Sequence, residues 1–338
     1  MALAVSAIAV TATALAGCAT SAPESSDEPT TVVINQAVQT INYLPLYVAQ
    51  EMGYFEDEGL DVKIDTGGSG TASFAAVLGG SAGFSIQDPV FVPKSHEQGG
   101  EGVVVAGILD RPVVFMVGKD SHDIQDDPTY LNGKKVIVSP APDTTYALMD
   151  RMIKDYDLKD VELISVSLGN ELAAVESGQA DYALLNEPGV SQGIAGQGLH
   201  LVYSWADAGD DWNPFAYSSL TSTQTYIEQN PETAQKVVNA FQRAYGYIYD
   251  DPDGAAAVAE KVFTDLDPAV VQDAVKRVIA ANGFAKTALV DEIAWDHNLT
   301  VAASVDNVKA YPSDATTYEN NVNTELAAEA AKKYPAAQ

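Results

Sequence analysis

Cysteine is nearly absent from this chain of 338 residues, which contains only Cys18. No intramolecular disulfide can form, so the fold must be stabilised by burial of apolar side chains. Histidine is also scarce: His96, His122, His200 and His297 are too scattered for the close His or Cys spacing that a zinc site requires. We therefore expect neither a metal ion nor a cofactor.

Basic residues are few, since 18 Lys and Arg stand against 47 Asp and Glu and the formal net charge is -29. Nucleic-acid partners are held mainly by clusters of Lys and Arg, so this composition excludes them. The acidic residues are spread along the chain, which is typical of a solvated, self-repelling surface. Long apolar runs are missing after the first residues, and none is long enough to span a membrane.

The chain opens with an apolar run from Leu3 that ends in Leu15, Ala16, Gly17 and Cys18. Small residues before a cysteine are typical of a lipoprotein signal, in which the cysteine is acylated after cleavage. We expect residues 1–18 to be this signal and the Ser, Thr and Pro-rich residues 19–31 to be a flexible tether. The protein would then be extracytoplasmic and lipid-anchored to the cell membrane; an ordinary cleaved secretory signal is the alternative.

Alternating strand and helix patterns follow for about three hundred residues. The pattern restarts after Lys119, which predicts two α/β units with mostly parallel sheets. Expected strands are 32–38, 60–64, 84–86, 102–109 and 113–117 in the first unit, and 135–138, 161–166 and 182–185 in the second. Expected helices are 43–53, 71–78, one starting at Pro89, 144–156, 171–176, and an almost continuous run over 224–282 in which Pro231, Pro252 and Pro268 mark helix starts.

A local pattern recurs in the two units at identical spacing. The first unit contains the series Leu78, Gly80, Ala82, Phe84 and Ile86. The second unit contains the corresponding series Glu176, Gly178, Ala180, Tyr182 and Leu184. Each series reads as a helix end, a glycine turn and a buried strand.

Two helix entrances carry the polar residues best suited to a ligand: Ser69, Gly70 and Thr71 at one, and Asp143, Thr144 and Thr145 at the other. Free N–H groups at a helix N-terminus can bind an anion or a polar ligand edge. Both entrances follow strands, where ligands usually bind in open α/β sheets. The alternative is that Ser69, Thr71 and Asp143 only cap their own helices.

Polar pairs also follow the two matching short strands: Gln87 with Asp88, and Asn186 with Glu187. If the units face each other, these groups flank a common cleft, although an acidic residue before proline also favours a helix start.

Other candidate ligand contacts are a cation and aromatic side chains near strand ends. Arg111 could hold an anion or pair with Asp110. Flat ligands could stack on aromatic residues. The remaining candidates are Asn42, Tyr43, Tyr146 and Trp212.

No nucleophile elbow or other catalytic constellation is visible, so we expect a protein that is not an enzyme. The alternative is a secreted enzyme acting on a small substrate with Asp88 and Glu187 as an acid-base pair.

Two segments resemble a family of substrate-binding proteins of ABC importers, whose members bind nitrate, taurine, alkanesulfonates or thiamine-pyrimidine precursors. The first segment, residues 43–64, resembles the opening of these proteins and has the sequence YLPLYVAQEMGYFEDEGLDVKI. Residues 177–188, SGQADYALLNEP, resemble the second-lobe segment of the same family. One departure is Gly83, where the family pattern carries Asp after Gly-x-x.

The resemblance implies a two-lobed periplasmic-binding-protein type II fold. Lobe 1 would comprise residues 32–117 and 217–338, lobe 2 residues 118–216, with hinges near 110–117 and 216–220. It further implies a monomer that closes on a small molecule and delivers it to an ABC permease with its ATPase. Because Asp88 and Glu187 would repel a bound anion, a nitrogen-bearing neutral or cationic ligand is favoured over sulfonate, taurine or nitrate.

Overall fold

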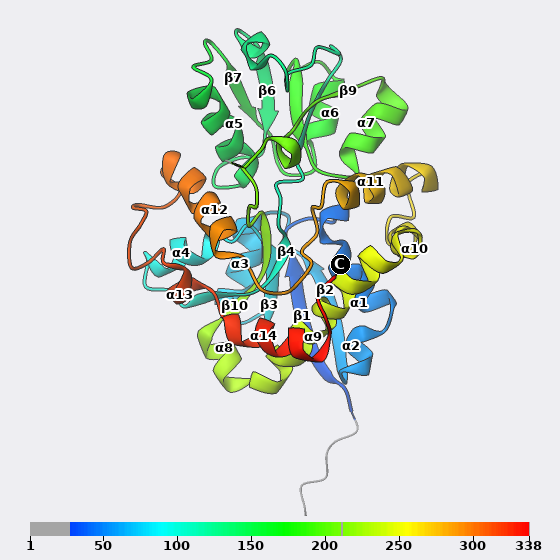
Figure 1. The fold of residues 1–338 in the computed structure, drawn as a ribbon, viewed down its shortest axis with the longest axis vertical. Helices are drawn as coiled ribbons and strands as arrows, with labels where there is room; N and C mark the ends of the chain where they lie inside the picture. Colours follow the sequence, from blue (N-terminus) through cyan, green and yellow to red (C-terminus); the bar gives the residue numbers. More distant parts are fainter. Residues whose placement is uncertain (1–27, 211, 338) are drawn as a thin grey trace, which may run out of the picture.

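The computed structural model of the protein describes residues 28–210 and 212–337, which form two lobes that each contain a mixed five-stranded sheet (Figure 1). This confirms the two-lobed α/β architecture predicted from the sequence. Cys18, the expected signal segment and residues 19–27 of the expected tether lie outside the described residues. In the part of the chain that the structure describes, no helix combines the length and apolarity needed to cross a membrane.

The sheet of lobe 1 has the strand order β2-β1-β3-β10-β4. The first three strands run parallel, whereas β10 is antiparallel to both β3 and β4. Its strands are β1 (Thr30–Gln36), β2 (Leu60–Thr66), β3 (Phe84–Gln87), β4 (Gly102–Leu109) and β10 (Ser218–Thr223). The strand β1 begins earlier than expected because the N–H of Thr30 donates to the carbonyl of Gly59 (3.0 Å), so residues 30 and 31 belong to the sheet.

The sheet of lobe 2 repeats this arrangement in the order β7-β6-β8-β5-β9. Again three strands run parallel, and β5 is antiparallel to β8 and β9. Its strands are β5 (Phe115–Gly118), β6 (Lys135–Val138), β7 (Glu162–Ser165), β8 (Tyr182–Leu185) and β9 (His200–Ser204). The sequence patterns did not predict β9. They also placed strand 113–117 in the first unit, whereas β5 belongs to the second sheet because it pairs with β8 and β9.

The antiparallel strand of each sheet is the one that the chain enters directly from the other lobe. After β4 the chain crosses into β5, and it returns through residues 205–217 into β10. The two crossing segments are bonded to each other, since the N–H of Phe215 donates to the carbonyl of Asp110 (2.8 Å) and that of Trp205 to Val114 (3.4 Å). The lobes are therefore joined by a paired connection.

Helices cover both faces of each sheet (Figure 1). Before the crossing, lobe 1 contains η1 (Ile41–Tyr43), α1 (Leu44–Glu51), α2 (Tyr54–Asp57), α3 (Gly70–Leu78) and α4 (Phe91–His96). Lobe 2 contains η2 (Pro128–Leu131), α5 (Thr144–Asp155), α6 (Glu171–Glu176) and α7 (Gly189–Gln197), and η3 (Trp205–Asp207) begins the return.

The last third of the chain is helical and returns to lobe 1. Pro231, Pro252 and Pro268 each occupy the first turn of a helix, as predicted, because proline lacks only an N–H that has no partner there. The helices are α8 (Gln224–Gln229), α9 (Pro231–Asp250), α10 (Pro252–Val262), α11 (Pro268–Ala280), α12 (Glu292–Ser304), α13 (Tyr318–Asn321) and α14 (Thr324–Lys333).

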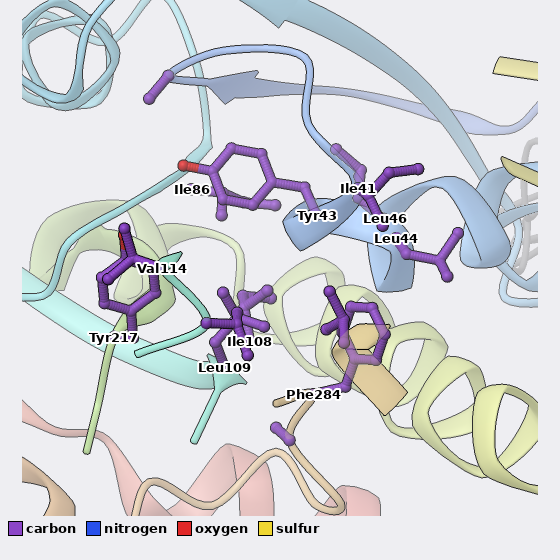
Figure 2. Packing of buried hydrophobic residues seen from close by; sticks show 14 of the residues in the cluster. Ile41, Tyr43, Leu44, Leu46, Ile86, Ile108, Leu109, Val114, Tyr217 and Phe284 are labelled. Carbon is purple, nitrogen blue, oxygen red and sulfur yellow. The ribbon is translucent and has the colours of Figure 1, made fainter. Parts of the chain in front are cut away.

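Buried apolar side chains make the core beneath the cleft between the lobes. Figure 2 shows Tyr43 and Tyr217 with aliphatic side chains of the lobe 1 sheet, including Ile86 and Ile108, all at most 7% exposed. A separate cluster forms around Trp295 of α12, whose indole N–H donates to the carbonyl of Thr316 (3.1 Å).

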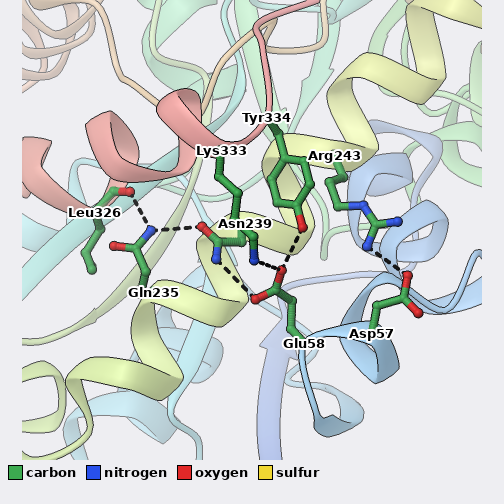
Figure 3. Close-up of polar contacts among 8 residues, drawn as sticks. All are labelled: Asp57, Glu58, Gln235, Asn239, Arg243, Leu326, Lys333 and Tyr334. Atoms are coloured by element: carbon green, nitrogen blue, oxygen red, sulfur yellow. Dashed lines mark hydrogen bonds and ion pairs between the residues drawn. The ribbon is translucent and has the colours of Figure 1, made fainter.

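The carboxylate of Glu58 holds the C-terminal helix against lobe 1 (Figure 3). It accepts hydrogen bonds from Lys333 Nζ (2.6 Å), Tyr334 Oη (2.9 Å) and Asn239 Nδ2 (3.1 Å). These bonds and the Lys333 charge hold the pKa of Glu58 below its usual value, although burial acts in the opposite direction.

The repeat predicted from the sequence is visible in the backbone. Gly80 and Gly178 both end a helix in the left-handed region, with φ values of +74° and +77°. Side chains rarely adopt this conformation, so glycine is required at both turns. Each turn leads into a buried strand, β3 in lobe 1 and β8 in lobe 2.

The repeat differs at Gly83, whose equivalent in lobe 2 is Asp181. The carboxylate of Asp181 accepts a bond from the N–H of Lys135 (2.8 Å). At Gly83, an added Cβ would lie 2.6 Å from the ring of Tyr226, which packs edge-on against Phe84. Tyr226 fills the space that an aspartate would need.

Gly83→Asp should lower the free energy of unfolding by about 2 kcal/mol, because the new side chain overlaps Tyr226. Chemical denaturation measures the loss. In the double variant with Tyr226→Ala the total loss should be smaller than the sum of the two single losses. Strictly additive losses would show that the two positions do not compete for space.

Candidate ligand-binding cleft

A cleft lies where the two lobes meet, and its empty volume, counted with the open solvent at its mouth, is about 480 Å³. Lobe 1 contributes the loop after β1, the start of α3, the end of β3 and the start of β10, and lobe 2 contributes the segments before α5 and α6 and after β8. The lining residues are Ala37, Val38, Thr40, Asn42, Tyr43, Gly70, Gln87, Asp88, Ser139, Asp143, Thr144, Thr145, Leu168, Asn186, Tyr217 and Ser218.

Asp88 is the carboxylate that lobe 1 presents to the cleft. Its Oδ1 atom accepts bonds from the N–H of Val90 (2.9 Å) and from Nδ2 of Asn298 in α12 (3.2 Å). Burial raises the pKa of Asp88 to about 7, and the nearby charge of Asp143 adds to the rise. The carboxyl therefore titrates near neutral pH.

Asp143 is the matching carboxylate of lobe 2. It stands directly before α5, but its side chain makes no capping bond with that helix. Burial and the neighbouring charge of Glu171 raise the pKa of Asp143 to about 6. An added Cβ on Gly70 would lie 3.2 Å from its Oδ1, so α3 of lobe 1 approaches this carboxyl closely.

Glu171 is the third buried carboxylate in this region. Its Oε1 accepts from the hydroxyl of Ser139 (3.0 Å) and its Oε2 from the N–H of Gly169 (2.7 Å). Burial raises its pKa above the usual value. Among the described residues no Lys or Arg lines the cleft, so no side chain there supplies a compensating positive charge.

Two buried amide oxygens in the cleft lack a hydrogen-bond partner within the protein. Gln87 donates its Nε2 to Thr221 Oγ1 (2.8 Å), which leaves its Oε1 unpaired. Asn42 likewise donates Nδ2 to Asn186 Oδ1 (3.1 Å) across the lobes. Both oxygens are therefore available to accept hydrogen bonds from a ligand in the cleft.

Tyrosine hydroxyls close the cleft at its base. Tyr217 donates to Asn186 Oδ1 (3.0 Å) and thereby connects the lobes. Burial, followed by the charge of Asp143, raises the pKa of Tyr43 far above its usual range. Burial likewise raises the pKa of Tyr217, so both hydroxyls remain protonated at neutral pH, but the Tyr217 proton is already donated to Asn186.

The structure brings most of the predicted site residues into this one cleft. Those in its lining are Asn42, Tyr43, Gly70, Gln87, Asp88, Thr144, Thr145 and Asn186. The remaining candidates lie elsewhere: Ser69, Thr71, Arg111, Tyr146, Glu187 and Trp212.

Each of these outlying residues has a different environment. Ser69 caps α3 by accepting from the N–H of Ala72 (3.2 Å), and Thr71 is exposed. Arg111 donates to the carbonyl of Ala206 (3.0 Å) and so fastens one crossing segment to the other. Tyr146 packs against the core from α5, while Trp212 faces the guanidinium of Arg151 at 5.9 Å.

Glu187 forms an ion pair between the lobes outside the cleft lining. Its carboxylate, fully buried, accepts from Arg277 Nε of α11 (2.7 Å) and from the hydroxyl of Ser191 (2.9 Å). Its carbonyl accepts from the hydroxyl of Thr40 (2.6 Å). On the opposite side, Lys154 of α5 donates to the carbonyl of Ser304 at the end of α12 (2.6 Å). The lobes are thus closed on each other at both sides (Figure 1).

The sequence model of the family described as NMT1/THI5 like matches residues 40–255, which is more than half of the chain. The chain belongs to this family. YtlA of Bacillus subtilis (strain 168), which carries the name of a binding protein, is 26% identical over 328 residues that cover 93% of this chain and 92% of YtlA. The family resemblance inferred from the sequence is confirmed.

Other relatives in the same comparison bear the name of an enzyme. The 4-amino-5-hydroxymethyl-2-methylpyrimidine phosphate synthase THI13 of Saccharomyces cerevisiae is 22% identical over 241 residues, which cover 68% of this chain and 69% of the yeast protein. Among solved structures, the periplasmic aliphatic sulphonate binding protein SsuA from Escherichia coli matches with a TM-score of 0.68 and 15% identity over 87% of this chain and 98% of SsuA. This likeness shows the periplasmic-binding-protein fold.

The ligand-free protein should lose stability as the pH rises from about 4 to about 7. The folded-state pKa of Asp88, about 7, lies above its unfolded value, so the folded state holds a proton that the unfolded state has released. This contribution is complete below the unfolded pKa and lost as the pH reaches the folded pKa, a change of up to about 4 kcal/mol. Asp88→Asn should flatten the profile measured by thermal denaturation; an unchanged slope would contradict the assignment.

Arg277→Ala should open the lobes, because it leaves Glu187 buried without a positive partner and opening returns that carboxylate to water. Small-angle scattering should report a larger radius of gyration than for the native chain. Lys276→Ala, an exposed neighbour on the same helix, is the matched control and should change nothing. Equal radii for both variants would mean that the ion pair does not hold the lobes together.

Proposed function

We propose that this chain is the substrate-binding protein of an ABC importer and that it closes its two lobes on a small nitrogen-bearing molecule, neutral or cationic. The observation that carries the proposal is the composition of the cleft between the lobes. It contains Asp88, Asp143 and the unpaired amide oxygens of Asn42 and Gln87, with no basic side chain among the described residues.

A positively charged or donor-rich ligand would complete this cleft. Its N–H groups would pair with the two amide oxygens, and its charge would offset the cost of ionising two buried carboxyls. A sulfonate or nitrate would instead add a third negative charge beside them. The favoured class is therefore an amine or an aminopyrimidine-like heterocycle.

The two lobes would close on the ligand because each lobe supplies some of the residues that line the cleft. Asp88 and Gln87 belong to lobe 1, whereas Asp143 and Asn186 belong to lobe 2, so a ligand contacts both sets only when the lobes meet. A ligand that binds the closed form better shifts the population toward it. The paired crossing segments form the hinge for that movement.

An enzyme is the alternative that the synthase relatives raise. The acid-base pair considered from the sequence is not assembled, because Asp88 lines the cleft while Glu187 lies outside the lining and binds Arg277. No histidine or lysine of the described residues lines the cleft either. These observations favour binding over catalysis.

An importer component of this kind is extracytoplasmic, and we propose that it is a monomer tethered to the membrane through a lipid on Cys18. Its partners would be a permease and the permease's ATPase.

A panel of ligands tests the proposal by thermal shift and titration calorimetry on refolded protein, since binding to the native state raises the melting temperature. Amines or aminopyrimidines should bind, and Asp88→Asn and Asp143→Asn should each weaken them about 10- to 100-fold. Asp65→Asn, on the exposed end of β2, is the matched control. The proposed ligand class would be wrong if the protein bound taurine, alkanesulfonates or nitrate and both cleft variants bound them as tightly as the native chain.

A further inference from the structure

A second cavity adjoins the cleft on the side of α10 and α11. It occupies about 970 Å³, including its open mouth, and shares Val38, Thr40, Leu168 and Asn186 with the cleft. The two spaces are therefore neighbours along the seam between the lobes, and these four residues form the wall that they share. In Figure 1 this side of the seam lies where α6 and α7 of lobe 2 face α10 and α11.

Aliphatic side chains that are only partly buried line part of this second cavity, beside polar residues such as Gln39, Gln192 and Thr264. Lobe 2 contributes Leu168 and Leu172, while lobe 1 contributes Val38, Val262 and Leu266. They come from separate segments of both lobes, yet all leave apolar surface uncovered at the same place. Apolar surface gathered around a cavity favours an apolar occupant.

Three charged side chains line this cavity: Glu171 and Glu187 are buried and already have partners, whereas Asp265 is exposed to solvent. Both carboxylate oxygens of Glu171 accept bonds from within lobe 2, and the carboxylate of Glu187 is paired with Arg277. No Lys or Arg of the described residues lines it. The cavity thus offers neither an anion partner nor an unpaired buried carboxylate, and it contrasts with the cleft beside Asp88.

We propose that the second cavity is a subsite for an aliphatic chain carried by the ligand. The full ligand class is then an amine or aminopyrimidine with a linear apolar substituent: the nitrogen-bearing head lies in the cleft, and the chain passes between Val38 and Leu168 into the second cavity. This inference rests on the proposed function, because it assumes that head group.

Two homologous series test it on the full chain: n-alkylamines from ethylamine to octylamine, and 4-aminopyrimidines with 5-alkyl groups of the same lengths. Each methylene that enters the cavity should raise the affinity about fourfold. Leu266→Trp, which fills the cavity without touching the cleft lining, should abolish this increment and leave the shortest members unaffected. Leu289→Trp, at an exposed leucine outside both spaces, is the matched control.

If Leu266→Trp fails to fold, Gln192→Trp at the same cavity replaces it. Short members that bind in both series without any gain from longer chains would overturn the subsite and leave the proposed function intact. A gain that persists in the filled-cavity variant would also overturn it, because the chain would then lie elsewhere. Failure of every member, short or long, would overturn the head-group class together with this inference.

Discussion

The arrangement of the cleft depends on one constraint: a carboxylate removed from water must be protonated, paired with positive charge or given donors. Asp88 and Asp143 come from different lobes and meet where no basic side chain lies among the described residues. Glu187 directly follows Asn186 of the cleft lining, but its carboxylate is paired with the positive charge of Arg277. The carboxylate that holds the lobes together thus has a positive partner, whereas the two that face the cleft have none among the described residues.

The fold makes this contrast possible because each lobe is built around its own five-stranded sheet. Each sheet receives its antiparallel strand from a crossing segment, and the crossings bond to each other through Phe215 and Trp205. The lobes can then approach as units while the cleft forms between them. The contacts between the lobes include the bonds of Thr40 with Glu187 and of Asn42 and Tyr217 with Asn186. The Glu187–Arg277 ion pair and the Lys154–Ser304 bond add to them.

Sequence patterns predicted the parts of this structure that local chemistry determines. Beta-branched runs predicted the positions of most strands but not of β9 or β10, and prolines predicted the starts of α9, α10 and α11. Gln87 and Asp88 lie in the cleft because they follow a strand whose edge faces the other lobe. Patterns could not predict the pairing of Glu187 with Arg277, 90 residues apart, or the bond of Arg111 to Ala206. Nor did they indicate Tyr217. These contacts depend on how the lobes close, and the periodicity of a sequence does not encode that. For Tyr217, its position beside the return crossing was the only feature of the sequence that could have indicated a place in the cleft.

Calorimetric titration at about pH 6.5, repeated in two buffers of different ionisation enthalpy, tests the central claim most directly. The probe is an amine that binds the full chain and is already protonated at this pH. Its charge should lower the pKa values of Asp88 and Asp143, about 7 and about 6 without ligand, so binding should release protons to the buffer. Proton uptake, or no exchange at all, would contradict the account, because the cleft carboxyls would then not be the groups that meet the ligand's charge.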